Sequence, residues 1–141
     1  MVVHKQNAFR LTLHSNPKQI TRVETFLHKI NRVAHLDEIE LHKLMVSLTE
    51  AVNNAIIHGN KLNETKKVVV QCKLLPDWLV VSVTDEGRGF KPDKVRNPLR
   101  KKNLLRNSGR GIFLMRTLMN KVEYEIGTSG VEVRLWLDLR K

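Results

Sequence analysis

Glu50 and Asn54 stand four residues apart in a segment whose apolar residues recur every three or four positions. On a helix this spacing points the two side chains the same way. A carboxylate and an amide placed together form an oxygen cluster that suits Mg²⁺ and a nucleotide bound through it. A carboxylate one turn away could also accept a proton from an attacking hydroxyl group. The alternative is that Glu50 and Asn54 are ordinary exposed residues on a helix surface. The spacing alone favours this alternative over a metal or nucleotide site.

A second candidate is the run Asp85-Glu86-Gly87-Arg88-Gly89, which follows the pattern of a strand. Glycines at alternate positions allow backbone angles and close approaches that a Cβ atom would prevent. An Asp that leaves a strand beside them could accept a hydrogen bond from an adenine amino group. Asp and Gly also form ordinary polar turns after strands, so that alternative stays open.

The third candidate is Ser108-Gly109-Arg110-Gly111, at the start of a predicted helix. A helix N-terminus offers unpaired N–H groups and a partial positive charge, and glycine lets phosphate oxygens reach that backbone. The alternative is ordinary N-capping by Ser108. The GxxxxGK[ST] pattern of a Walker loop is absent from the chain.

Apolar periodicity predicts the helices and strands that would position these candidates. Strands are expected at 9–13, 67–75, 79–84, 122–126 and 131–139, and helices at 17–35, 37–58 and from 109 onward. The order strand, helix, helix, strand, strand, loop, helix, strand, strand predicts an α/β two-layer arrangement. We expect a mixed, mainly antiparallel sheet with helices on one face, and a long loop over Lys91–Ser108.

Three helix ends carry recognisable capping residues. Asn16 before Pro17 is typical of an N-cap followed by proline at the first helical position. Asp37 with Glu40 three residues later resembles a capping box. Gly59 follows the last periodic residue of the second helix, where a left-handed C-cap is expected.

Several other residues have a simple structural interpretation. Cys72 is the only cysteine, so it is expected to be a small buried side chain in a strand rather than a reactive thiol. His58 has no second ligand at metal spacing, and at a helix end it is expected to interact with the last carbonyl groups. Trp78 and Trp136 are expected to pack rather than to stack on a nucleic-acid base.

Length and composition favour a single globular domain over residues 1–141. Hydrophobic residues make up 41% of the chain and charged residues 28%. No signal peptide or membrane span is recognisable, so we expect a soluble, cytoplasmic protein. The net charge of +11 permits nucleic-acid binding, but the densest basic run, residues 96–106, contains no aromatic residue for stacking. A direct nucleic-acid partner is therefore not expected.

The three candidates occur in one order, and together they resemble the conserved boxes of a known superfamily. Thr49–Gly59 (TEAVNNAIIHG) is similar to the N box of the GHKL ATP-binding proteins, Asp85–Gly89 to their G1 box and Gly109–Gly111 to their G2 box. The sequence of the N box and the length of the chain resemble those of the bacterial anti-sigma factors that are also serine kinases. The resemblance extends over nearly the whole chain from Phe9 onward.

This resemblance implies the Bergerat fold, an α/β sandwich that holds ATP and Mg²⁺ between helices and sheet beneath a lid, here about residues 91–108. By position, it makes Glu50 the general base and Asn54 the Mg²⁺ ligand, and Asp85 the partner of the adenine amino group. Gly87 and Gly89 would shape the floor of the pocket. The phosphates would be held by Gly109, Arg110 and Gly111, with Arg106 as a further candidate.

The resemblance also implies a function: an anti-sigma factor that phosphorylates a serine or threonine of an anti-anti-sigma antagonist protein. The implied partners are a sigma factor and that antagonist, without a membrane, and a homodimer is what relatives suggest. One alternative is a catalytically silent nucleotide-binding protein that only sequesters its partner. Others are the ATP-binding domain of a histidine-kinase-like system and a small basic nucleic-acid binder, whose affinity would fall steeply with salt.

Overall fold

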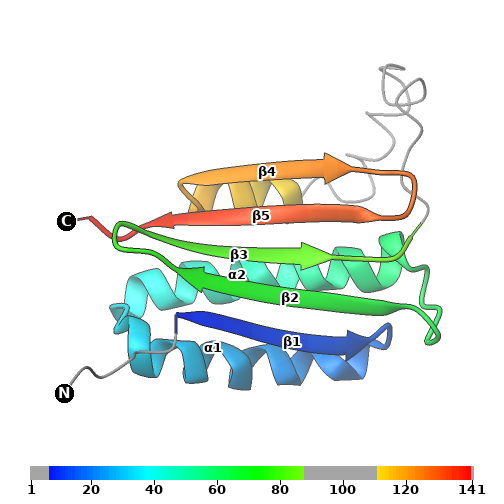
Figure 1. The fold of residues 1–141 in the computed structure, drawn as a ribbon, viewed down its shortest axis with the longest axis horizontal. Coiled ribbons are helices and arrows are strands. Elements are labelled where there is room, and N and C mark those ends of the chain that lie inside the picture. Colours follow the sequence, from blue (N-terminus) through cyan, green and yellow to red (C-terminus); the bar gives the residue numbers. More distant parts are fainter. Residues whose placement is uncertain (1–6, 88–110, 141) are drawn as a thin grey trace.

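The computed structural model describes residues 7–87 and 111–140, which form one five-stranded sheet with helices on one face (Figure 1). The strands are β1 (Ala8–His14), β2 (Lys67–Leu74), β3 (Trp78–Thr84), β4 (Lys121–Ile126) and β5 (Val131–Asp138). Their spatial order is β1-β2-β3-β5-β4, and all four pairings are antiparallel. The predicted α/β sandwich is confirmed, although no parallel pair occurs among the described strands.

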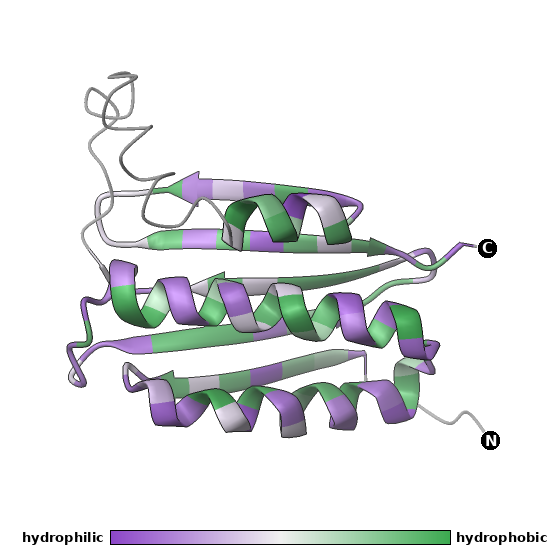
Figure 2. Cartoon of the chain, turned by 180° about the vertical axis from the view of Figure 1, so that it is seen from behind, coloured by the Kyte–Doolittle hydropathy of each residue, from purple (hydrophilic) through white to green (hydrophobic). Residues whose placement is uncertain are grey.

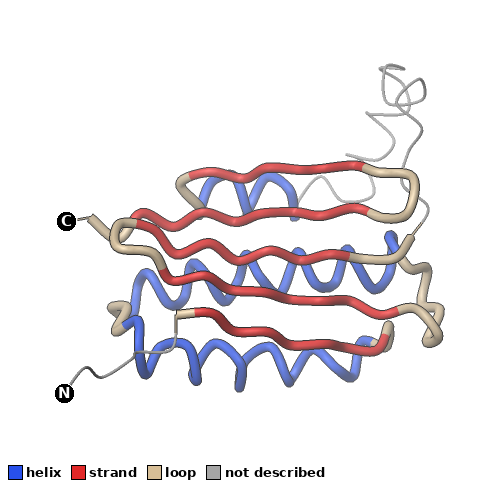
Figure 3. Tube along the Cα trace, in the orientation of Figure 1, coloured by secondary structure: helices blue, strands red, loops and turns tan. Residues whose placement is uncertain are grey.

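The helical layer consists of α1 (Thr21–Ala34), α2 (Glu38–Asn54) and a helix over residues 111–118. A 3₁₀ turn, η1 (Pro17–Ile20), leads into α1, and a π turn, η2 (Ala55–Gly59), extends α2. Figure 3 shows the helices together behind the strands, and Figure 2 shows them in front when the molecule is turned round. One face of the sheet is therefore covered by the helices, and the other face is not.

Alternation along the strands explains why one face is covered. Val133, Leu135 and Leu137 of β5 are buried, whereas the residues between them are partly exposed. The helices contribute apolar side chains to the same core, including Leu44, Leu48 and Val52 of α2. Cys72 belongs to this core, where burial raises the pKa of its thiol to about 12. The prediction of a buried cysteine in a strand is confirmed.

Both predicted N-caps are present. The Asn16 side chain accepts a hydrogen bond from Lys18 N at 3.0 Å, and the Asp37 carboxylate accepts one from Glu40 N at 2.8 Å. Each cap satisfies a backbone N–H group that a helix start leaves unpaired. Asp37 fixes the start of α2, the helix that carries Glu50 and Asn54.

The predicted left-handed C-cap at Gly59 is wrong. No described glycine has a positive φ, and the left-handed residues are instead Lys61 (φ 51°) and Leu62 (φ 61°). The chain continues from α2 into the π turn η2, which ends at Gly59 itself. A Cβ atom at Gly59 would overlap the carboxylate of Asp85, so the position requires glycine because of packing rather than backbone angle.

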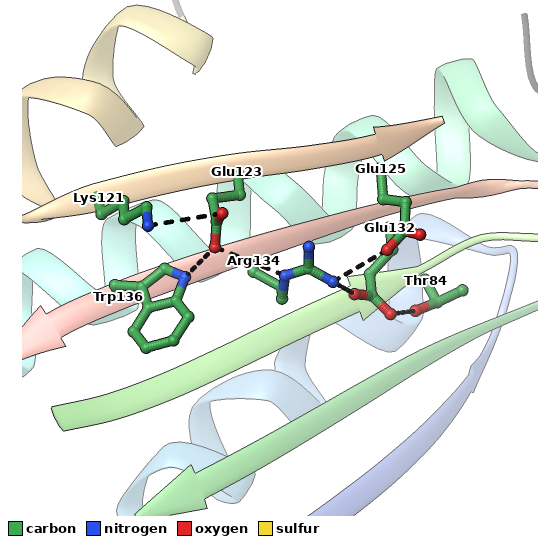
Figure 4. Close-up of polar contacts among 7 residues, drawn as sticks. All are labelled: Thr84, Lys121, Glu123, Glu125, Glu132, Arg134 and Trp136. Carbon is green, nitrogen blue, oxygen red and sulfur yellow. Dashed lines mark hydrogen bonds and ion pairs between the residues drawn. The ribbon is translucent and has the colours of Figure 1, made fainter. Parts of the chain in front are cut away.

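The uncovered face of the sheet carries a network of charged and aromatic side chains (Figure 4). Arg134 of β5 forms ion pairs with Glu123, Glu125 and Glu132. Trp136 donates a hydrogen bond from Nε1 to Glu123 at 2.7 Å and packs edge-on against Trp78 at 5.8 Å between ring centroids. The two tryptophans therefore pack, as predicted. Among the helices of the described ranges, none is long and apolar enough for a membrane span.

Candidate functional site

A cavity of about 540 Å³ lies between the helical layer and one end of the sheet. Its volume is in the range of small-ligand pockets in proteins. Apolar walls come from both layers: Ala51, Ala55, Val83, Ile112, Met115, Ile126, Val131 and Val133. The polar lining includes Asn54 and Asp85, two residues that are 31 positions apart in the sequence. The cavity combines an apolar interior with a few polar groups, which is the usual lining of a small-ligand site.

Glu50 and Asn54 lie together against the start of the described part of the third helix. A Cβ atom at Gly111 would stand 2.7 Å from Glu50 Oε2 and 3.5 Å from Asn54 Nδ2. Both side chains are half-buried rather than freely exposed, so they do not form an ordinary solvent-facing helix surface. Gly111 thus lets the third helix approach α2 at the position of these two polar groups. Asn54 lines the cavity, and Glu50 lies one turn before it on α2.

Asp85 also lines the cavity and is buried, with 7% of its surface exposed. Its Oδ1 accepts hydrogen bonds from Gly87 N at 2.9 Å and from Val131 N at 3.2 Å. Oδ2 receives none from the part of the chain that the structure describes, and it lies on the side of Gly59. The carboxylate is thus held by one oxygen, which leaves the other available to accept a hydrogen bond from a ligand.

Three glycines surround Asp85. A Cβ atom at Gly59 would overlap its carboxylate, one at Gly130 would overlap its carbonyl oxygen, and one at Gly87 would overlap the carbonyl oxygen of Gly59. The end of η2, the turn after β3 and the β4–β5 hairpin therefore meet without intervening side chains. This close packing holds the carboxylate in one place.

The β4–β5 hairpin offers a direct test of this packing. Gly130→Ala should lower the free energy of unfolding by about 1–3 kcal/mol, because the new methyl group overlaps backbone that cannot move away easily. Gly127→Ala is the matched control, since a Cβ atom there would lie 3.6 Å from Gly130 O, an ordinary contact. Chemical denaturation of both variants measures the difference. Equal stabilities of the two variants would contradict the packing described.

The ionisation of Asp85 should also affect stability. Burial raises the pKa of Asp85 above its ordinary value of 3.8, while the N–H groups of Gly87 and Val131 and the charge of Lys66 oppose that rise. The folded chain then holds the proton more tightly than the unfolded chain. The stabilisation that protonated Asp85 provides is fully present below the pKa of Asp85 in the unfolded chain. It is lost as the pH rises through the higher pKa of the folded chain.

Urea denaturation of the ligand-free protein at several pH values checks this expectation. The stability of the wild type relative to Asp85→Asn should fall as the pH rises from about 3.8 through the raised pKa. The variant cannot ionise at this position, so the comparison removes the titration of all other groups. A relative stability that rises or stays constant over this window would contradict a raised pKa.

Sequence reasoning missed several residues of this region. His58, Lys61 and Lys66 all line the cavity, whereas the sequence favours a helix-end role for His58 and indicates none for the two lysines. Asn60, 2% exposed, bonds through its side chain to three separate segments and gave no sequence signal. Among the described residues, no group of three or more His, Cys, Asp or Glu side chains could hold a metal ion.

The structure brings together most of the predicted site residues that it describes. Asn54 and Asp85 line one cavity, Gly87 is bonded to Asp85, and Glu50 lies beside Gly111. Gly89, Arg106, Gly109, Arg110 and the predicted loop 91–108 lie outside the described residues. Their roles, like those of Glu50, Asn54 and Asp85, stay predictions.

Comparison with known proteins identifies the family of the chain. The family model of the histidine kinase-like ATPase domain matches residues 13–137. An anti-sigma F factor of Clostridium perfringens is 36% identical over 95 residues, which are 64% of this chain and 68% of that protein. The serine-protein kinase RsbW of Bacillus licheniformis is 34% identical over 105 residues, 70% of this chain and 64% of that protein.

Solved structures agree on the fold. The structure of the RsbU and RsbW domains of a Mycobacterium tuberculosis protein superimposes with a TM-score of 0.69 at 19% identity, over 94% of this chain and 32% of that longer chain. The catalytic domain of the histidine kinase ThkA superimposes with a TM-score of 0.54 at 16% identity, over 92% of this chain and 97% of that one. The chain therefore belongs to the GHKL family of histidine kinase-like ATPase domains, together with the anti-sigma F factors and serine-protein kinases to which it is similar.

Proposed function

We propose that this chain is an ATP-dependent serine/threonine-protein kinase that acts as an anti-sigma factor. The observation that carries the proposal is the convergence of Asn54 and Asp85 on one cavity, with Glu50 and Gly111 in contact beside it. Relatives named anti-sigma F factor and serine-protein kinase support the biological role. Residues 1–141 would form one ATP-binding kinase domain, with residues 91–108 as its lid.

The adenine base would enter the apolar part of the cavity with its amino group toward Asp85. Oδ1 of Asp85 is already bonded to the protein, so Oδ2 would accept the hydrogen bond from the amino group. A buried carboxylate acceptor favours an amino-substituted purine, because a carbonyl at the same position would leave two acceptors facing each other. This arrangement would give the site its preference for adenine.

The phosphates would extend toward the contact between α2 and the third helix. Gly111 keeps this region free of a side chain, and Gly109, Arg110 and Arg106 would add backbone N–H groups and positive charge. Lys61 and Lys66 also line the cavity and add positive charge to it. A basic pocket of this kind would favour a polyanionic ligand.

Magnesium fits the donor set beside Gly111. The Asn54 side chain would supply one oxygen ligand, and Mg²⁺ ordinarily completes its shell with waters and phosphate oxygens. When bound, the ion would neutralise negative charge on the phosphates. The half-buried Glu50 would accept the proton of a serine or threonine hydroxyl group as its oxygen attacks the γ-phosphorus and ADP leaves.

The partners would be a sigma factor and an antagonist protein. A chain with a net charge of +11 complements an acidic protein surface and would attract it over a distance. Phosphorylation would add negative charge to the antagonist and so change its affinity for this chain. A homodimer is part of the same proposal.

Incubation of the purified chain with labelled ATP, Mg²⁺ and candidate antagonist proteins tests the function. The expected result is label on one serine or threonine of one antagonist, located by mass spectrometry. Omission of Mg²⁺ is the control and should abolish the transfer. Stable binding of a partner without any transfer of phosphate would instead support a catalytically silent sequestering protein.

A further inference from the structure

Asn60 joins four segments through one buried side chain and its own backbone. Nδ2 donates hydrogen bonds to Ser15 Oγ at 2.8 Å and to Lys67 O at 3.0 Å, and Oδ1 accepts one from Glu86 N at 2.8 Å. Its backbone N–H donates to Ala55 O at 2.8 Å and closes the π turn η2. Both donors of the amide are thus used, and its oxygen accepts one further hydrogen bond.

The two ends of the amide serve different parts of the molecule. The donor end ties the residue after β1 to the start of β2, which is a connection within the fold. The acceptor end holds the N–H of Glu86, which lies between Asp85 and Gly87 in the turn that carries the buried carboxylate. Only the acceptor end therefore reaches the turn that forms the site.

The geometry around Gly59 shows why this hydrogen bond matters for Asp85. Gly59 immediately precedes Asn60, and its backbone lies so close to the Asp85 carboxylate that a Cβ atom would not fit. The hydrogen bond from Glu86 N to Asn60 Oδ1 links the residues that follow Asp85 and Gly59 in the chain. A change in this bond would alter the distance between the end of η2 and the carboxylate, and so the direction of Oδ2.

We infer that Asn60 is a positioning residue: its Oδ1 holds the turn 85–87 so that the free oxygen of Asp85 faces the cavity, and it thereby sets the preference for an amino-substituted purine. This inference rests on the proposed function, in which Asp85 accepts a hydrogen bond from the base. Asn60 itself would touch neither the phosphates nor the reacting atoms.

The test compares the dissociation constants of Mg-ATP and Mg-ITP, because inosine carries an oxygen in place of the adenine amino group. Calorimetric titrations of the wild type should show a clear preference for ATP. In Asn60→Ala the ratio of the two dissociation constants should shrink about tenfold, since the turn is no longer fixed. Asn60→Asp keeps the acceptor for Glu86 N and should retain most of the preference, although it loses both donors.

Ser15→Ala is the matched control for a loss of stability alone. It removes the hydroxyl that bonds to the donor end of Asn60 and leaves the acceptor end intact. Its melting temperature should fall while its preference for ATP over ITP stays that of the wild type. The ratio of the two affinities separates positioning from folding, because a purely structural defect would weaken both nucleotides equally.

The outcomes distinguish the inference from the proposed function. If the wild type discriminates and Asn60→Ala discriminates equally well, the positioning role is overturned and the proposed function stands. If Ser15→Ala loses the preference as fully as Asn60→Ala, the effect comes from stability, and the positioning role is again overturned. If the wild type binds ATP and ITP equally, or neither, both the role of Asp85 and the inference built on it are overturned.

Discussion

Glu50→Gln should lower the rate of phosphoryl transfer by about a hundredfold or more while Mg-ATP affinity changes little. Glutamine keeps the shape of the side chain and its place against Gly111, but it cannot accept the proton of an attacking hydroxyl group. Glu50 does not line the cavity that would hold the base, so binding should be largely retained. Single-turnover transfer to the antagonist and calorimetric binding of Mg-ATP measure the two effects separately.

Glu38→Gln is the control for this experiment. Glu38 is exposed at the start of α2, at the far end of the helix from Glu50. Its substitution removes the same charge from the same helix and should leave transfer unchanged. Transfer by Glu50→Gln at the wild-type rate would show that another group is the base. A parallel loss of binding and transfer would show that Glu50 acts in binding the nucleotide instead.

Asp85→Asn should weaken Mg-ATP binding by roughly tenfold to a hundredfold, the value of a hydrogen bond to a charged group. The oxygen of asparagine can still accept from Gly87 N and Val131 N, so the turn should be preserved. The amide nitrogen then takes the place of Oδ2 and presents a donor to the adenine amino group, which is also a donor. For the same reason Mg-ITP should bind relatively better to the variant than to the wild type.

Asp138→Asn is the matched control for Asp85→Asn. Asp138 lies at the end of β5 and pairs with Arg140, away from the cavity lining. The same change of charge there should leave both nucleotide affinities unaltered. An unchanged affinity of Asp85→Asn for ATP, with an unchanged ratio of ATP to ITP, would exclude Asp85 from recognition of the base.

The sequence predicts the elements of this fold well because each is specified by local patterns. Period-2 alternation predicts β5 within one residue at its C-terminal end, and the caps at Asn16 and Asp37 fix two helix starts. The end of α2 is different. A glycine after a helix favours a left-handed C-cap, but the structure places Gly59 against Asp85, a neighbour 26 positions away in the sequence.

In the candidate site, too, local patterns predict some residues and leave others unpredicted. Glu50 and Asn54 can be placed on one side of a helix from their spacing, and the resemblance to GHKL proteins implies that Asp85 joins them. The roles of Gly130 and Asn60 in the packing around Asp85 depend on a hairpin and a turn that meet only in the folded chain. Neither residue has a local pattern that distinguishes it from an ordinary turn glycine or a polar loop residue.

Calorimetric titration of the purified chain with Mg-ATP measures directly whether one cavity bounded by Asn54 and Asp85 holds the nucleotide. We expect a measurable heat of association with one ATP per chain, which weakens in Asp85→Asn and persists in Glu50→Gln. Absence of any heat with the wild type, at concentrations of protein and nucleotide that suit an ATP-binding domain, would exclude this cavity as an ATP site.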